Sequence, residues 1–368
     1  MKKYLPVLLA SLIGNLLFSA TVSAEPYLAL RSNQKCSACH INPLGGGARS
    51  SFGSYYGSQI LPANPGNQTL FDSGQVTETL RVGADLRMNM NLREYDSELV
   101  KSVQSFNTQS GQLYFTLQPK DSRFMLYFDE QVAPGGARNR EAWVLSKIGK
   151  TNHYIKAGTI MLPFGYRFED DSAFVRTNSN VTFDNNDTGV ELGLEYAKGT
   201  INFAITNGTG GSNNDDTSFQ FVSRGEFVIN HFRVGASVIL NDAEAGAQTV
   251  FGVFGGFNVY DFNVIGEFNT VEDESTPNAL DNGNLIKQAA LFEINRQVVK
   301  GYNVKLTLEY FDPDTELDED YRSRTSFLVE ATPWASVQIR AGVRIGEDIP
   351  QNLTGSYTEG FMQLHMYY

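Results

Sequence analysis

From Gln75 to the end of the chain, apolar and polar residues alternate in segments of about ten residues, separated by breaks rich in Gly, Asn and Asp. In the clearest segment, every second residue from Leu80 to Leu92 is apolar. The intervening positions include Arg81, Asp85 and Arg87. A period of two places these two sets of side chains on opposite faces of a β-strand, so the pattern predicts a β protein.

The alternation predicts sixteen strands. Eight upward strands are expected near residues 76–93, 123–132, 153–161, 200–207, 231–240, 261–271, 301–311 and 335–345. Eight downward partners are expected near residues 103–118, 140–148, 188–197, 218–229, 249–258, 285–297, 323–331 and 357–368. Short breaks, such as 119–122 and 149–152, alternate with long ones, such as 207–217 and 271–284. An even strand number with short turns at one end and long loops at the other is typical of bacterial membrane barrels.

Composition is consistent with this architecture. The mean hydropathy of -0.26 resembles that of a soluble protein, but a membrane barrel turns its apolar face to lipid and its polar face to a watery lumen. We therefore expect residues 72–368 to form an all-β, 16-stranded transmembrane antiparallel β-barrel in the bacterial outer membrane. Met362, Leu364, Met366 and Tyr368 resemble the closing strand of such barrels. A soluble β-sandwich is the alternative fold.

Charge and length exclude two classes of protein. The 368-residue chain carries a formal charge of -12 and has no stripe rich in Lys and Arg, which excludes a basic nucleic-acid binder. Beyond the first two dozen residues no run approaches the roughly 18 to 20 apolar residues of a spanning helix. A helical membrane protein is therefore excluded as well.

The first 24 residues have the features of a secretory signal peptide. Lys2 and Lys3 precede the apolar stretch 5–18, and Val22-Ser23-Ala24 provides small residues at the cleavage site. An N-terminal core helix is the alternative. Cleavage after Ala24 would remove two lysines and no acid, leaving a formal charge of -14. No cysteine lies at the cleavage point, so a lipid anchor there is not expected.

Both cysteines lie in the sequence Cys36-Ser37-Ala38-Cys39-His40, the C-x-x-C-H spacing of covalent c-type haem attachment. Two thiols one turn apart can add to the haem vinyl groups, and the next imidazole can then bind the iron. The motif predicts one covalent haem c, held by Cys36 and Cys39 with His40 as axial ligand. The alternatives are a disulfide with an incidental histidine, and a zinc site, which would need a second pair of ligands.

The haem segment is expected to span residues 25–71 and to plug or cap the barrel. So short a segment seldom builds its own core without a cofactor or host. Gly45-Gly46-Gly47 predicts a turn that permits close approach to the haem. No Met or His follows His40 before Met88, so the iron is either five-coordinate or ligated from elsewhere. His365, which the period of two places in the lumen, is the first candidate for a sixth ligand; a rim histidine without a haem role is the alternative.

The stretch from Leu162 to Asp187 follows the fifth predicted strand. In sixteen-stranded porins, the loop at this position folds into the pore. Pro163-Phe164-Gly165, Arg167 and Arg176 resemble the phosphate-selective porins, in which lumen arginines favour anions. The alternative is a solvated loop whose arginines pair with Glu169, Asp170 and Asp171.

Acidic runs at Glu272–Glu274 and between Asp312 and Asp320 fall in two predicted outer loops. They could gather cations such as Fe²⁺ or Ca²⁺ at the cell surface. The alternative is an ordinary solvated surface.

Taken together, a signal peptide, one C-x-x-C-H motif and a sixteen-stranded barrel resemble the fused monohaem cytochrome-porins of the bacterial outer membrane. The resemblance covers the whole chain in architecture, and its motifs are Arg31 to His40 and the closing strand. Some members of that family oxidise extracellular Fe(II). The resemblance implies an outer-membrane electron conduit with possible Fe(II):cytochrome c oxidoreductase activity.

The partners that this resemblance implies are a periplasmic cytochrome or other electron carrier, extracellular iron or another redox species, and outer-membrane lipid. No nucleic-acid partner is expected. The competing hypothesis is an anion-preferring diffusion porin whose haem segment is a gate, a sensor or a structural plug.

Overall fold

The computed structural model describes residues 25–66, 74–211, 213–214, 216–278, 280 and 283–368. The N-terminal helical elements are α2 (Pro26–Arg31), α3 (Cys36–Cys39), α4 (Ser51–Tyr55) and the π-helix η1 (Tyr56–Ile60), and α5 (Phe174–Ser179) lies between β5 and β6. The strands are β1 (Leu80–Tyr95), β2 (Val103–Leu117), β3 (Phe124–Ala133), β4 (Arg138–Lys147), β5 (Tyr154–Ile160), β6 (Asp187–Tyr196), β7 (Gly199–Thr206), β8 (Gln220–Ile229), β9 (Phe232–Ala243), β10 (Gly246–Val259), β11 (Phe262–Pro277), β12 (Asn284–Val299), β13 (Tyr302–Asp312), β14 (Arg322–Ala331), β15 (Val337–Glu347) and β16 (Tyr357–Tyr367). The predicted signal peptide and the predicted junction between residues 71 and 72 lie outside the described residues.

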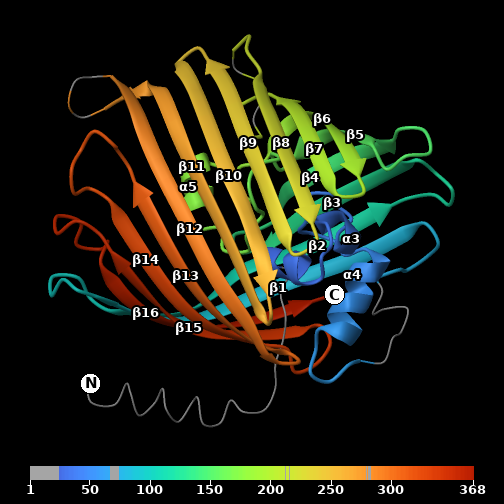
Figure 1. Cartoon of the computed structure of the whole chain (residues 1–368), viewed down its shortest axis with the longest axis horizontal. Helices are drawn as coiled ribbons and strands as arrows, with labels where there is room; N and C mark the ends of the chain where they lie inside the picture. Colours follow the sequence, from blue (N-terminus) through green and yellow to red (C-terminus); the bar gives the residue numbers. More distant parts are fainter. Residues whose placement is uncertain (1–24, 67–73, 212, 215, 279, 281–282) are drawn as a thin grey trace.

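The sixteen strands close into one antiparallel barrel, as the alternation predicted (Figure 1). Each strand pairs with its sequence neighbours, and β1 pairs with β16 to complete the ring. Closure leaves no unpaired sheet edge, which a strand exposed to lipid could not tolerate. Among the described residues, no helix is long and apolar enough to cross a membrane.

The barrel is apolar outside and polar inside. On β7, Phe203 and Ile205 are 47% and 48% exposed, whereas the intervening Ala204 is buried and Asn202 is 1% exposed. On β16, Met362, Leu364 and Met366 point outward as predicted, and the alternate residues are buried. This inversion explains how the chain builds a membrane wall without a long apolar run.

The strand boundaries differ from the predicted ones at the outer end of the barrel. β11 continues to Pro277, so Glu272–Glu274 belong to a strand and the prediction that they lie in a loop was wrong. Asp273 pairs with Gln248 of β10 and with Leu285 of β12. Above the lipid, a strand can carry charged side chains on both faces. The alternation of apolar and polar residues therefore ends before the backbone pairing between the strands does.

Residues 25–66, which we call the plug, occupy the lumen at one end of the barrel and the mouth of that end (Figure 1). Helix α2 contacts β10 and β11, and the backbone of Asn64 forms a parallel bridge with Trp334. Figure 1 shows α3 and α4 at the end of the barrel where the C-terminus lies. The short turns are at this end, which is the periplasmic end of such barrels. The plug therefore fills the periplasmic part of the lumen.

The connection between β5 and β6, residues 161–186, is the constriction loop. Its helix α5 contacts β11, β12 and β13, across the barrel from the strands that the loop joins. The loop therefore crosses the lumen, as its position after the fifth strand predicted. Its buried residues Phe168, Ala173 and Val175 pack with Leu30 of the plug in one apolar cluster.

Candidate functional site

The C-x-x-C-H motif forms one helical turn followed by an extended residue. Cys36 and Cys39 begin and end α3, and the His40 amide donates to the Cys36 carbonyl at 3.1 Å. His40 then forms an antiparallel backbone bridge with Arg49, so the chain folds back on itself directly after the motif. The turn places both thiols and the imidazole on one short, fixed piece of backbone.

In the turn after the motif, close contacts and positive φ angles leave no room for a side chain at two of the glycines. Gly46 and Gly47 have φ values of 72° and 63°. A Cβ on Gly47 would lie 1.9 Å from the Tyr127 hydroxyl oxygen on the barrel wall, and one on Gly46 would lie 2.7 Å from the Arg167 Nε. The turn predicted at Gly45–Gly47 is present, and the observed close approach is to the wall and the constriction loop.

Cys36, Cys39 and His40 line one cavity between the plug and the lumen wall. Its apolar lining includes Leu28, Leu44, Leu61, Tyr56, Tyr166 and Tyr367. Both cysteines are free thiols in this structure. The cavity has a volume of about 80 Å³ and is also lined by charged side chains. It combines two thiols, one imidazole and apolar or aromatic side chains, which are the residue types that a covalently attached porphyrin needs, and it would have to widen to hold one.

The imidazole of His40 is buried. Burial, together with the nearby Arg49 and Arg167 guanidinium groups, lowers the pKa of His40 to about 3. A neutral imidazole is the form that ligates a metal. The His40 Nδ1 is also buried without a hydrogen-bond partner among the described residues. The residues present therefore fit a covalently bound haem.

Polar contacts around its circumference hold the plug against the wall. They join Tyr27 to Glu330 at 2.7 Å, Arg31 to Asn303 at 2.8 Å, Asn42 to Glu141 at 3.0 Å and the Gln34 carbonyl to Arg233 at 2.6 Å, with a further pair between Lys35 and Glu195. These wall partners lie on β4, β6, β9, β13 and β14. The plug is therefore anchored on several sides of the lumen.

The two predicted pore arginines are both paired. Arg167 lies 2.8 Å from Glu141 of β4 and donates to the Gly45 carbonyl of the plug at 2.8 Å. Arg176, on α5, lies 2.8 Å from Asp171 of the same loop. The loop acids Glu169 and Asp170 instead bind wall arginines. Arg167 therefore ties the constriction loop to the wall and the plug, whereas Arg176 pairs within the loop.

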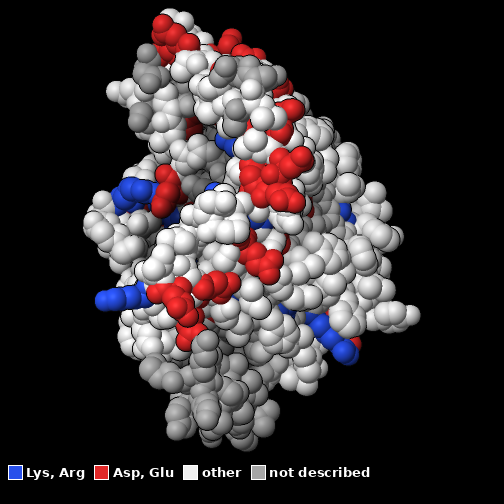
Figure 2. Space-filling view, turned by 90° about the vertical axis from the view of Figure 1, so that its left-hand side faces the viewer, with Lys and Arg blue, Asp and Glu red and all other residues white. Residues whose placement is uncertain are grey.

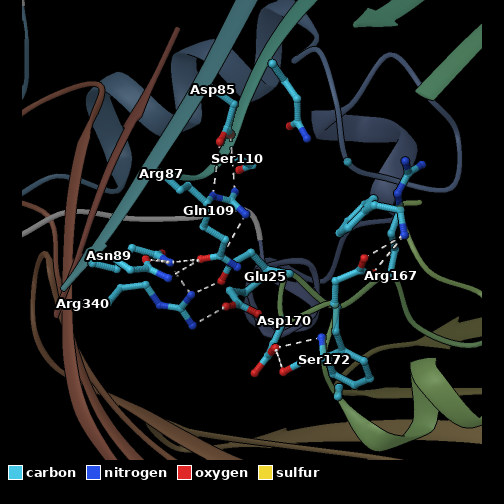
Figure 3. A pocket seen from close by; sticks show the side chains of 18 of the residues that line it. Glu25, Asp85, Arg87, Asn89, Gln109, Ser110, Arg167, Asp170, Ser172 and Arg340 are labelled. Atoms are coloured by element: carbon cyan, nitrogen blue, oxygen red, sulfur yellow. Dashed lines mark hydrogen bonds and ion pairs between the residues drawn. The ribbon is translucent and has the colours of Figure 1, made fainter. Parts of the chain in front are cut away.

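A cavity of about 470 Å³ lies on the outer side of the plug, between the constriction loop and the wall (Figure 3). Glu169 lies 2.8 Å from Arg87 and also contacts Arg340. Asp170 lies 2.6 Å from Arg344. Burial alone would raise the pKa of Asp170, but Arg344 and Arg324 hold it well below its usual range. We call this space the outer cavity.

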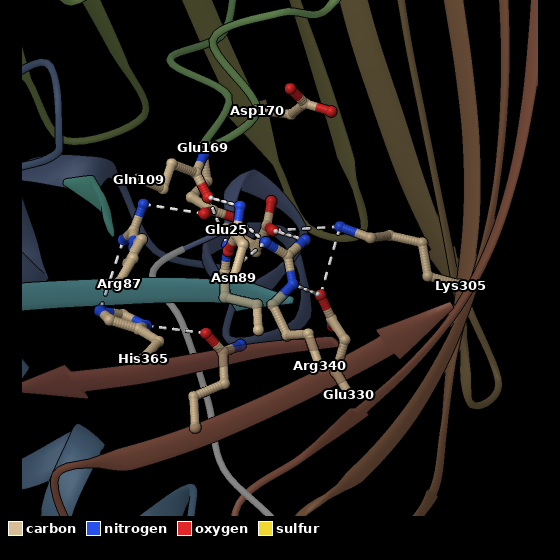
Figure 4. A network of polar contacts seen from close by, with 12 residues as sticks. Glu25, Arg87, Asn89, Gln109, Glu169, Asp170, Lys305, Glu330, Arg340 and His365 are labelled. Atoms are coloured by element: carbon tan, nitrogen blue, oxygen red, sulfur yellow. Dashed lines mark hydrogen bonds and ion pairs between the residues drawn. The ribbon is translucent and has the colours of Figure 1, made fainter. Parts of the chain in front are cut away.

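A buried network of charges joins the start of the plug to β13, β14 and β15 (Figure 4). Lys305 lies 3.0 Å from Glu25 and 3.3 Å from Glu330, and Arg340 lies 3.2 Å from Glu25. Burial raises the pKa of Glu25 to about 8 despite these two cations. The sequence prediction did not include this network. Alternation along β13, β14 and β15 could have placed Lys305, Glu330 and Arg340 in the lumen, but it gives no signal for Glu25, which lies on no strand.

His365 lies in the lumen, as the period of two predicted, but both of its nitrogens are hydrogen-bonded. Nδ1 is 2.7 Å from the Gln338 Oε1, and Nε2 is 2.8 Å from the Asp85 Oδ2. The β16 residue that lines the cysteine cavity is Tyr367, and the lining includes no methionine and no histidine besides His40. The structure therefore does not bring His365 to the motif.

The acidic runs do not assemble a metal site among the described residues, where no group of three or more His, Cys, Asp or Glu side chains is placed to hold an ion. Asp314 to Asp320 lie in the connection between β13 and β14, as predicted. A zinc site at the motif likewise has no further ligands within the described part of the chain.

No protein-family model and no curated protein sequence matches the chain. Solved outer-membrane channels share its fold. OprB of Pseudomonas putida has a TM-score of 0.63 at 7% identity, with 81% of this chain and 95% of that chain covered. The anion-selective porin of Comamonas acidovorans has a TM-score of 0.61 at 8% identity over 79% and 99%. DcaP of Acinetobacter baumannii has a TM-score of 0.58 at 11% identity over 78% and 97%.

The protein therefore has the porin fold of the bacterial outer membrane. At these identities the similarity shows the fold alone. The function must be inferred from this chain's own plug, cavities and charges.

Proposed function

We propose that the protein is an outer-membrane electron conduit in which the plug carries one covalent haem c inside the barrel. The observation that carries this proposal is that Cys36, Cys39 and His40 line a single cavity within the lumen. A motif with a merely local structural role would not need a cavity shared by both thiols, the imidazole and residues of the constriction loop.

In this proposal the Cys36 and Cys39 thiols add to the vinyl groups and the His40 imidazole is the protein ligand of the iron. The bound haem would supply a one-electron redox centre. The protein's own contribution is to fix the thiols on one turn and to exclude bulk water with Leu28, Leu44 and Tyr166.

The position of the motif supports exchange with both sides of the membrane. His40 lines the cysteine cavity, the outer cavity and an inner cavity of about 640 Å³ that also contains periplasmic turn residues. The apolar band of such a barrel is about 25 Å tall, so one redox centre can serve only if it lies within the lumen. An extracellular donor such as Fe(II) and a periplasmic electron carrier are the partners that fit this arrangement.

The test uses purified protein from cells that mature c-type cytochromes. We expect one haem-stained band at the mature mass, absent from Cys36→Ala/Cys39→Ala, and haem-dependent electron transfer from an external iron complex to a dye sealed inside proteoliposomes. A folded protein without haem, or a haem protein that transfers no electrons, would overturn the proposal.

A second candidate is a diffusion pore, which the similarity to porins and the loop across the lumen favour. It predicts a steady ionic conductance that does not depend on the haem redox state. Single-channel recordings of the reduced and the oxidised protein distinguish the two functions. The plug and the paired Arg167 and Arg176 argue against a wide anion-selective pore.

A further inference from the structure

The two ends of the barrel carry opposite charge. The outer connections, apart from the constriction loop, are acidic, and Lys101 is the one basic residue among their described positions. Figure 2 shows acidic side chains gathered over this outer end of the molecule. At the described positions of these connections the acids are Asp96, Glu98, Asp216, Glu244, Asp314, Glu316, Asp318, Glu319, Asp320 and Asp348.

The periplasmic turns show the reverse. Within the described residues, the turns that join β2 to β3, β4 to β5, β6 to β7 and β12 to β13 contain Lys120, Arg123, Lys150, Lys198 and Lys300, while the acids in the periplasmic turns are Asp121 and Asp261. The chain as a whole is acidic, with a formal charge of -12. The basic character of this end is therefore local.

Three lysines line the inner cavity, through which the motif faces the periplasm. Lys35 belongs to the plug, Lys147 ends β4 and Lys198 lies in the turn between β6 and β7. Ser37 and Ala38, the residues between the two cysteines, line the same cavity. The three lysines thus line the same opening through which the Cys36–His40 motif faces the periplasm.

Two of these lysines lack an internal partner. Lys35 pairs with Glu195, whereas the exposed Lys147 and Lys198 form no ion pair with any described residue. On β4, Trp143, Leu145 and Lys147 alternate on the lumen face. The Lys147 ammonium group therefore faces the mouth of the barrel rather than the lipid.

We infer that the inner cavity rim formed by Lys35, Lys147 and Lys198 is the docking surface for a soluble periplasmic electron-transfer protein with an acidic patch around its redox centre. This inference rests on the proposed function and adds the chemistry of the partner. Attraction between these lysines and an acidic patch on the partner would speed diffusional encounter and orient the partner at the mouth of the barrel. This attraction weakens as the salt concentration rises.

The test measures binding and electron exchange with the full-length, haem-loaded protein in detergent. The acidic probe is the soluble domain of cytochrome b5, and the basic counter-probe is mitochondrial cytochrome c. We expect the acidic probe to bind and to exchange electrons at low ionic strength. For Lys147→Glu/Lys198→Glu, the association rate should fall at least about tenfold. The single variants Lys147→Glu and Lys198→Glu should each slow association. Lys101→Glu, the same charge change at an exposed lysine of the outer end, is their control and should leave the rate unchanged.

Equal rates for wild type and Lys147→Glu/Lys198→Glu would overturn the inference, as would an equal loss in Lys101→Glu. Competition by phosphatidylglycerol vesicles that removes the acidic probe would also overturn it, because the lysines would then serve anionic lipid. Probe binding is measured by biolayer interferometry and does not require haem. A missing haem spectrum would therefore refute the proposed function while leaving the docking result readable.

Discussion

Arg167 of the constriction loop lies 2.8 Å from Glu141 of the barrel wall, and Glu141 is completely buried. The same guanidinium donates to the Gly45 carbonyl of the plug. Arg167 therefore links the constriction loop, the barrel wall and the plug. Breaking a buried ion pair by removing one partner costs about 3–5 kcal/mol, because the other charge is left unpaired.

We expect Arg167→Ala to loosen the plug and to raise single-channel conductance. An anion-attracting arginine predicts the opposite sign, since its removal lowers anion conductance. Arg176→Ala is the matched control, because Arg176 pairs within its own loop. A fall in conductance in both variants would show that these arginines act on passing anions.

Gly47→Ala should displace the plug. Its φ of 63° disfavours any side chain, and the added Cβ would lie 1.9 Å from the Tyr127 hydroxyl oxygen. We expect a loss of about 1–3 kcal/mol in plug docking, measured as faster proteolysis of residues 25–66 in the folded barrel. Gly135→Ala also carries a positive φ, 82°, but has nothing within 4 Å of its Cβ. If Gly135→Ala speeds proteolysis of the plug as much as Gly47→Ala does, the contact with Tyr127 is not the cause.

Plug docking should weaken as pH rises. In the chain that retains residues 1–24, burial raises the pKa of Glu25 from 4.5 to about 8, so the docked plug binds a proton that the free plug releases between these values. This contribution is fully present below pH 4.5 and is lost as pH rises through 8, at no more than about 1.4 kcal/mol per pH unit.

Protease accessibility of the plug at pH 5 and pH 8, in protein refolded with residues 1–24 attached, measures this effect. Glu25→Gln should reduce the change in accessibility over that interval, because its amide cannot titrate. A pH dependence that persists unchanged in Glu25→Gln would assign the effect to another group.

His365→Ala should leave the spectrum of the oxidised haem unchanged, because both His365 nitrogens are bonded to Gln338 and Asp85. The substitution should instead destabilise the barrel by about 1–3 kcal/mol by leaving the buried Asp85 underpaired. Urea unfolding monitored by heat-modifiable gel mobility measures the second effect. A change in the haem spectrum with unaltered stability would restore His365 as the sixth ligand.

The strand order was predictable from sequence because lipid imposes a strict alternation wherever it touches the wall. Leu80 to Leu92 show this pattern, and β1 lies there. The same rule fails above the membrane, where water contacts both faces. That is why the alternation predicts a loop at Glu272–Glu274, whereas these residues lie in β11.

The grouping of lumen residues was not predictable from one sequence. Alternation places Glu330 and Arg340 inside the barrel, but their contact depends on the register between β14 and β15, which sets them directly opposite each other. It also places His365 and Tyr367 on one face. Only the position of the plug decides that Tyr367, rather than His365, lines the cysteine cavity.

The closing strand contacts the plug directly. The Tyr367 hydroxyl donates to the Gly57 carbonyl at 3.2 Å, and the Arg49 guanidinium lies 4.1 Å from the centre of the Tyr367 ring. Tyr367 pairs with Asp85 across the β1–β16 seam, where the ring of strands closes. The plug thus behaves as an intramolecular ligand of the closed barrel. Any interaction that stabilises the docked plug therefore also stabilises the pairing of β1 with β16. If the plug carries the proposed haem, haem attachment and barrel closure would be thermodynamically linked, and a chain that lacks this haem would close less completely.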